Sequence, residues 1–381
     1  MKINPLRMIA AALLLALGAG ILAFVAREKN AGARDFIAYW SAGQLLRQGG
    51  DPYDAAAVLR LEQTAGFSSS EPLIMRNPPT ALFLALPLGY VGANAASVLW
   101  MVLLLGCTIL SVRLIWQLNG QPPTRTHLLS YCFAPLMECL MAGQLGILLL
   151  LGVVLFLTFL RTRPYWAGAA LVLCAVKPHL FVLFGVVLIL WALSRRAYAV
   201  LIGAIAAVAA CAVLAYLVDP HAWAQYDQML HTAGIMQQVV PTWGELLRQL
   251  INRNAIWLQF VPEGLGLAWA LRYYARRRAR WNWMLEGQLV LIVSVLCSPY
   301  ALLPDEALLL PAVLTGAYLA EETGRSLIPL GIVAIAAMIE VLVNVPMTTI
   351  DYIWTAPAWL AWFLYATHNA RAASAPTEVM E

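Results

Sequence analysis

The 381-residue chain is 62% hydrophobic and only 12% charged, with a formal net charge of +4. A soluble domain is typically about 25% charged and roughly half apolar, so this composition excludes a soluble globular protein. The apolar residues form nearly uncharged blocks, and about 20 such residues cross a bilayer as a helix. Strands of a membrane barrel alternate apolar and polar residues, which these blocks do not. We therefore expect an all-α, polytopic helical membrane protein.

The first apolar block, residues 8–26, follows Lys2 and Arg7. It is long for the apolar part of a signal peptide, and we expect an uncleaved first helix whose N-terminus is cytoplasmic. Residues 27–77, which form the least apolar stretch, predict an amphipathic first outer loop. Its two expected helices lie along the outer membrane surface, and the second begins after Asp54, a favoured N-cap residue.

The rest of the chain alternates apolar blocks with short basic loops. A re-entrant segment or short span is expected at 80–91, and a polar segment at 219–253. Counting the first helix, the pattern predicts about 12 spans in one membrane domain, residues 1–369, followed by a disordered cytoplasmic tail, 370–381. The further helices are expected near 95–116, 127–141, 143–160, 164–176, 178–193, 197–218, 254–271, 282–297, 305–320, 326–343 and 353–369.

The basic loops set the expected orientation. Arginines cluster at 161–163, at 195–196 and at 272–280, each between apolar blocks. Short basic loops face the cytoplasm, so the expected location is the cell inner (plasma) membrane, with both termini cytoplasmic. Since this topological interpretation accounts for the arginines, no nucleic-acid partner is expected.

Asp35 is the first candidate for chemistry. It opens the stretch Asp35-Phe-Ile-Ala-Tyr39-Trp-Ser-Ala-Gly-Gln-Leu-Leu, just beyond the first expected helix. A carboxylate there can act as a general base that takes a proton from a sugar hydroxyl. It can equally be the N-cap of the helix that follows.

Two further ionisable residues interrupt apolar blocks, where charges are costly and often functional. Lys177 precedes Pro178 and His179, and its ammonium group needs either an anionic partner, such as a phosphate, or a route to the membrane interface. Asp305 either binds a sugar or a cation, or caps the helix from Glu306. Gln144, after Gly143, is a candidate to line a cavity.

Signatures of soluble enzymes are absent. The sequence contains no glycine-rich phosphate loop, no nucleophile elbow and no His-Glu-x-x-His pair. No metal-ligand spacing appears, so no metal ligands are assigned and no cofactor is expected, although a divalent metal is not excluded.

The stretch from Asp35, followed by Gly50-Asp-Pro-Tyr-Asp54, resembles the first outer loop of glycosyltransferase family 87. Further elements follow in that family's order over roughly the first 320 residues: Asn77-Pro-Pro with Leu86-Pro-Leu, Gly143-Gln144, Ala167-Gly168 leading to Lys177-Pro178, and Ser298-Pro-Tyr300 before Leu310-Pro311. The chain departs from the family where Asn77 replaces a common tyrosine, and where Pro304-Asp305-Glu306 lacks a histidine.

The resemblance implies a C-type glycosyltransferase fold. Its expected donor is a sugar on a polyprenyl phosphate, and its expected acceptor is a lipid or glycan at the outer face of the lipid bilayer. By the same resemblance Asp35 would be the catalytic base, and Lys177 would lie where a basic residue can hold the donor phosphate. The residues expected to bind substrate are Tyr39, Arg76, Asn77, Gln144, Lys177, His179 and Asp305.

Two other functions remain open from the sequence. A transporter or flippase of lipid-linked sugars favours broken helices around a central site, and Lys177-Pro178 is a feature of that kind. A polysaccharide polymerase or ligase would place its functional groups in a large later outer loop. The motif-bearing loop comes first in this chain, and the leading hypothesis is therefore a hexosyl- or mannosyltransferase-like enzyme.

Overall fold

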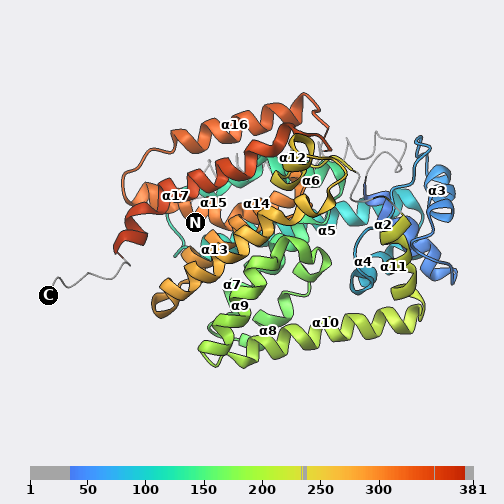
Figure 1. Ribbon diagram of the computed structural model, residues 1–381, viewed down its shortest axis with the longest axis horizontal. Coiled ribbons are helices and arrows are strands. Elements are labelled where there is room, and N and C mark those ends of the chain that lie inside the picture. The colour runs from blue at the N-terminus through green and yellow to red at the C-terminus, as the bar shows by residue number, and fades with distance from the viewer. Residues whose placement is uncertain (1–34, 233, 235–237, 347, 374–381) are drawn as a thin grey trace, which may run out of the picture.

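The computed structural model describes residues 35–373 except 233, 235–237 and 347, and this part of the chain contains helices and no strand (Figure 1). The predicted first helix, the N-terminal orientation and most of the predicted tail lie outside the described residues. The helices of the first half are α2 (Phe36–Arg47), α3 (Ala55–Thr64), η2 (Pro79–Ala81), α4 (Leu82–Ala85), η3 (Leu86–Tyr90), α5 (Ala93–Leu118), η4 (Thr126–Cys132), α6 (Ala134–Ala142), α7 (Gly146–Phe159), α8 (Pro164–Ala170), η5 (Cys174–Val176), η6 (Pro178–Phe181) and α9 (Val182–Ser194).

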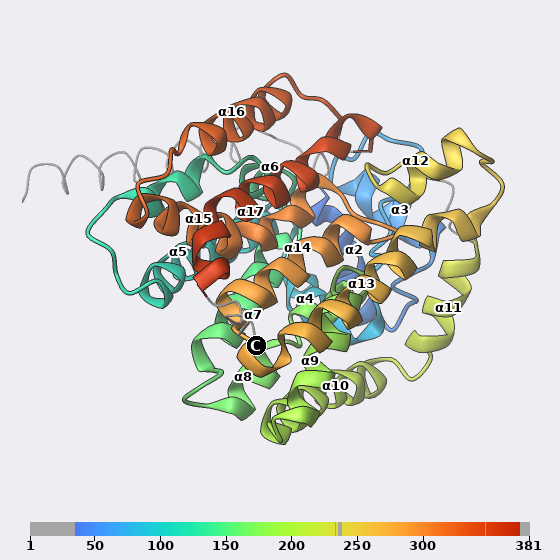
Figure 2. The same ribbon diagram turned by 60° about the vertical axis from the view of Figure 1, so that its left-hand side comes forward.

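The second half begins with α10 (Tyr198–Val218), α11 (Ala222–Thr232), α12 (Trp243–Leu250), η8 (Ile256–Phe260) and α13 (Val261–Arg277). It continues with η9 (Arg278–Arg280), η10 (Trp283–Gly287), α14 (Gln288–Cys297), η11 (Leu303–Leu309), α15 (Leu310–Glu322), α16 (Ile328–Leu342), η12 (Ile350–Trp354) and α17 (Thr355–Ala373). In both views α14 lies between α16 and α17 on one side and α8 to α10 on the other (Figures 1 and 2).

Three described helices are long and apolar enough to cross a membrane: 93–118, 198–218 and 303–322. The first is about half buried and the second mostly exposed, whereas the third is almost wholly buried and forms the centre of the bundle. Six shorter apolar helices accompany them. The all-helical membrane architecture is thus supported, and the count of 12 spans remains a prediction.

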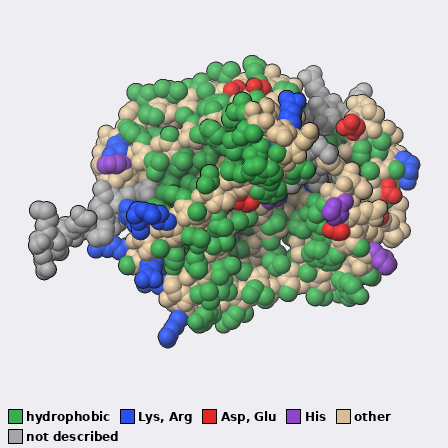
Figure 3. Space-filling view, in the orientation of Figure 1, with side chains coloured by type: hydrophobic (Ala, Val, Ile, Leu, Met, Phe, Trp, Pro, Cys, Tyr) green, Lys and Arg blue, Asp and Glu red, His purple; other side chains and the backbone are tan. Residues whose placement is uncertain are grey.

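The surface separates apolar, basic and acidic regions. Apolar side chains cover most of the face in Figure 3, as expected of a surface in contact with lipid. In that view most of the lysine and arginine side chains lie toward the left, with others at the upper right and the right edge, and most of the acidic side chains and histidines lie toward the centre and right. The orientation of the chain in the membrane stays a prediction from the basic loops.

The helix α2 lies in the interior, which corrects the prediction that both helices of the outer loop lie on the membrane surface. Ten of its twelve residues are buried. Two glycines allow this close packing: a Cβ on Gly43 would lie 2.1 Å from the Ala85 carbonyl oxygen, and one on Gly89 would lie 2.1 Å from the Gly43 carbonyl oxygen. By contrast, α3 is largely exposed, and Asp54 caps it as predicted by accepting from the Ala56 and Ala57 amides at 2.8 and 2.9 Å.

We expect Gly43→Ala to destabilise the protein, because the added methyl group overlaps the Ala85 carbonyl and overpacking costs about 1–3 kcal/mol. Gly106→Ala is the matched control, since its Cβ would meet nothing within 4 Å in the middle of α5. Thermal unfolding in detergent should show a lower Tm for Gly43→Ala and no decrease for Gly106→Ala. Equal Tm values for the two variants would contradict the tight docking of α2.

Glu62 ties α3 to the chain that follows it. Its side chain is fully buried, and Oε2 accepts a hydrogen bond from the Leu73 amide at 3.1 Å. Burial raises the pKa of this carboxyl to about 7, because the charged form is poorly solvated there. The folded outer loop therefore favours protonated Glu62 more than the unfolded chain does.

This shift gives the outer loop a pH-dependent stability. The stabilisation that Glu62 provides is complete below the ordinary pKa of 4.5 and is lost as pH rises through about 7. Glu62→Gln should therefore flatten the decrease in Tm between pH 5 and pH 8 and raise the Tm at pH 8. Glu71→Gln, at an exposed carboxylate of the same loop, should leave the wild-type profile unchanged.

Candidate active site

Four segments far apart in the sequence meet at one polar centre. Asp35 lies at the start of α2, and Gln144 lies in the turn between α6 and α7. Lys177 separates η5 from η6, at the break predicted before Pro178, and Asp305 lies within η11. Hydrogen bonds and charge interactions connect the four side chains.

The turn that carries Gln144 depends on Gly143. This residue has a φ of +74°, which a side chain would strain, and a Cβ there would lie 2.8 Å from Cβ of Phe36. The Trp100 indole donates to the Gly143 carbonyl at 2.7 Å, which anchors the turn to α5. Glycine thus lets the turn approach the first residue of α2 and brings Gln144 beside Asp35.

The Asp35 carboxylate faces the site. Its Oδ2 accepts a hydrogen bond from Nε2 of Gln144, whose Oε1 in turn accepts from the Tyr39 hydroxyl at 3.4 Å. Asp35 occupies the N-cap position of α2, yet its side chain makes no capping bond there. Of the two roles that the sequence left open, capping is therefore absent. The carboxylate remains available for chemistry.

Burial also adjusts the basicity of Asp35. It raises the pKa of the carboxyl above its ordinary value, and the hydrogen bond from Gln144 and the charge of Lys177 offset part of that shift. A raised pKa makes the carboxylate a stronger base than an exposed aspartate.

Lys177 and Asp305 form a buried ion pair. Nζ of Lys177 lies 2.5 Å from Oδ1 of Asp305, and Oδ2 of Asp305 accepts from the Leu302 amide at 3.0 Å. The anionic partner that the sequence predicts for Lys177 is thus a carboxylate. The Lys177 side chain does not extend to the membrane interface. The prediction that Asp305 caps a helix from Glu306 is wrong in position, because the helix begins at Leu303. Asp305 is its third residue, and its side chain bonds back to the amide of Leu302 at the N-cap.

A second cationic group, Arg76, lies in the same neighbourhood. Arg76 hydrogen-bonds the Tyr300 hydroxyl and donates through a guanidinium nitrogen to Oε1 of Gln238. Within the described part of the chain it forms no ion pair. The His179 ring meets the Tyr300 ring edge to face at 5.9 Å, and its Nε2 is buried without a partner among the described residues.

Asn77 connects the first polar loop to the segment that carries Lys177. Its side-chain Nδ2 donates to the Val176 carbonyl at 2.9 Å, and its backbone carbonyl accepts from the Tyr53 hydroxyl at 3.0 Å. These bonds tie the outer loop to the residue that precedes Lys177. Asn77 therefore has a structural role in this site, and its predicted contact with substrate stays a prediction.

Tyr300 and Gln238 were missed as site residues in the sequence. Tyr300 stands in the noted Ser298-Pro-Tyr300 element, and a polar aromatic residue between two apolar blocks was the available signal. Gln238 lies in the polar segment and carries no motif, so only the fold brings it to Arg76.

A model of glycosyltransferase family 87 matches residues 76–299, which is more than half of the chain. The chain belongs to glycosyltransferase family 87. Searches of curated proteins and of solved structures give no significant match. The match includes Arg76, Gln144, Lys177 and His179 and ends one residue before Tyr300. Membership makes this protein a glycosyltransferase, with a sugar donor and an acceptor as its substrates.

Removing one partner of the buried ion pair should destabilise the protein more than removing the charges of both partners. Lys177→Met leaves Asp305 charged and unpaired, and such losses cost about 3–5 kcal/mol. In Lys177→Met/Asp305→Asn no charge remains, and the asparagine oxygen can still accept from the Leu302 amide. Thermal unfolding should therefore give the single variant the lower Tm, and the reverse order would contradict the buried pair.

Proposed function

We propose that this glycosyltransferase moves a hexose or related sugar from a polyprenyl-phosphate donor to a lipid or glycan acceptor at the outer face of the membrane. Asp35 is the general base. The observation that carries the proposal is the position of its carboxylate, held by Gln144 within the electrostatic influence of Lys177. Basic and acidic groups thus meet at one centre, as sugar transfer from a phosphate requires.

The proposed reaction is a single displacement at the anomeric carbon. The acceptor oxygen forms a bond to that carbon while its proton passes to Asp35. The bond between the anomeric carbon and the phosphate oxygen breaks, and its electron pair leaves with the phosphate. Arg76 is suited to balance the charge that develops on this oxygen, whereas most of the Lys177 charge is offset by Asp305. The step calls on no cofactor.

An apolar groove supports a lipid-linked donor. It has a volume of about 670 Å³ and lies between α12, α13, α14 and α17, with Trp243, Leu265, Trp269 and Val293 among its lining residues. The lining reaches Cys297, the last residue of α14, after which the turn with Tyr300 begins. A prenyl chain is the part of the proposed donor that this apolar lining would accommodate. Asp35 does not line the groove.

The first test is transfer in lipid nanodiscs. The purified protein is given a panel of radiolabelled polyprenyl-phosphate sugars with membrane lipid extract, with and without EDTA. We expect wild type to move label into a new product. Asp35→Asn should lower the rate about 10²- to 10⁴-fold, the range for loss of a general base. Asp54→Asn is the matched control, because it preserves the oxygen that caps exposed α3.

The pattern of results separates the alternatives. Transfer that persists in a folded Asp35→Asn variant would refute the base assignment while keeping the enzyme. A rate that does not fall as the pH is lowered would also refute it, because activity must fall when Asp35, whose pKa burial raises, becomes protonated. Lipid scrambling without transfer from any donor would favour the flippase instead.

A further inference from the structure

The segment from Gln238 to Phe260 lies over the turn that carries Tyr300 and contacts it through side chains to which no role has been given. We propose that Gln259 is a positioning residue for the donor-phosphate side of the active site, and that Arg248 holds Gln259 in place. The proposal rests on the proposed function. It adds two residues that act through Tyr300 and do not touch the substrate.

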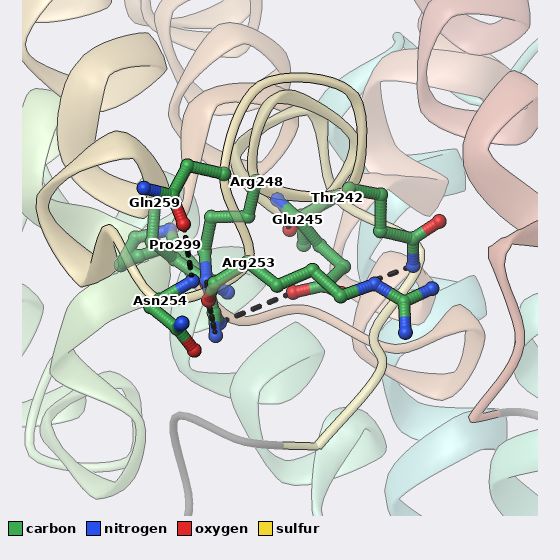
Figure 4. A network of polar contacts seen from close by, with 9 residues as sticks. Thr242, Glu245, Arg248, Arg253, Asn254, Gln259 and Pro299 are labelled. Atoms are coloured by element: carbon green, nitrogen blue, oxygen red, sulfur yellow. Dashed lines mark hydrogen bonds and ion pairs between the residues drawn. The ribbon is translucent and has the colours of Figure 1, made fainter.

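A buried polar network joins α12 to η8 (Figure 4). The Arg248 guanidinium pairs with Glu245 at 3.2 Å and donates to Oε1 of Gln259 at 2.6 Å. It also donates to the Arg253 carbonyl at 2.9 and 3.2 Å. The backbones of α12 and η8 also pack closely, because a Cβ on Gly244 would lie 2.3 Å from the Gln259 carbonyl oxygen. Gln259 is thereby fixed from two sides.

The polar side chains of this network face inward, whereas several apolar side chains of the same segment face outward. Glu245, Arg248 and Gln259 are 5%, 6% and 2% exposed, whereas Leu250 and Trp257 are 73% and 67% exposed. Exposed tryptophan and leucine suit the boundary between lipid headgroups and acyl chains. Burying an ion pair brings little net stability, so the inward network is better explained by the geometry that it fixes.

The network reaches the site through one main-chain carbonyl. Nε2 of Gln259 donates to the Pro299 carbonyl at 2.6 Å, and the Ser298 hydroxyl donates to the Tyr300 carbonyl at 2.9 Å. These bonds fix the turn on which the Tyr300 ring is mounted. Tyr300 contacts His179 and Arg76.

Arg76 is held from the same segment. Its guanidinium donates to Gln238, near the beginning of the segment, and bonds Tyr300, whose turn is held by Gln259 near its end. The segment thus orients both the cation and the tyrosine beside it. Losing the bond from Gln259 to Pro299 should make Arg76 and Tyr300 less ordered and weaken binding of the donor phosphate. The acceptor side should be unaffected, because Asp35 keeps its hydrogen bond with Gln144.

Two substitutions at Gln259 isolate the contact. Gln259→Glu keeps an oxygen for Arg248 but loses the N–H that donates to Pro299, whereas Gln259→Leu loses both. Arg253→Ala is the control, because it removes an exposed side chain and keeps the carbonyl that accepts from Arg248. Each full-length variant is measured in nanodiscs by thermal unfolding, by hydrogen exchange of amides 298–303, and by its Kd for undecaprenyl phosphate. Donor and acceptor KM are measured with the donor that wild type uses.

We expect both Gln259 variants to exchange amides 298–303 faster, and to raise the undecaprenyl phosphate Kd and the donor KM about tenfold (about 1.4 kcal/mol). Acceptor KM and the Arg253→Ala values should remain at wild-type levels. If Gln259 has a purely structural role, its variants change both KM values, or they change the Tm alone. Either of these results would overturn the proposal. Unchanged amide exchange and an unchanged Kd in Gln259→Glu would overturn it too. If wild type transfers no sugar, the proposed function fails, and exchange and Kd still decide the role of Gln259.

Discussion

The buried pair of Lys177 and Asp305 is the interaction on which the site depends. Either charge alone would be costly in an apolar bundle, so each requires the other. Their pairing fixes the break before Pro178 against η11, the segment that opens the most buried span-length helix, 303–322. It also places a charge pair beside the Asp35 carboxylate without leaving an uncompensated charge in the bundle.

Close backbone packing supplies the second constraint. Glycines at 43, 89 and 143 bring α2 against η3 and against the turn between α6 and α7, at distances that leave no room for side chains. As a result, the start of the outer loop is held inside the bundle and Asp35 meets Gln144. The composition of this polar loop predicts a place on the membrane surface. In the structure its first helix is buried, and the proposed base, Asp35, therefore lies inside the site.

The two sides of the site carry different kinds of side chain. One side, Asp35 with Gln144 and Tyr39, is suited to the acceptor proton, and the other, Arg76 with Tyr300 and His179, is suited to an anionic leaving group. Asp35, Tyr39 and Arg76 all come from the first polar loop, whereas Gln238 and Gln259 of the later polar segment contact Arg76 and the turn of Tyr300. Family membership gives the class of reaction, and this arrangement suggests how two polar segments share it.

The sequence by itself determined the helical membrane class, the family and most helix positions, because hydropathy, capping and breaks at proline act within a few residues. The N-cap role of Asp54 and the break at Lys177 followed in the same way. Only the tertiary structure decided that α2 is buried, that Lys177 pairs with a residue 128 positions away, and that Gln259 holds Pro299. These outcomes depend on contacts between distant segments, and no local pattern of residue types encodes which buried charge or carbonyl a side chain will meet.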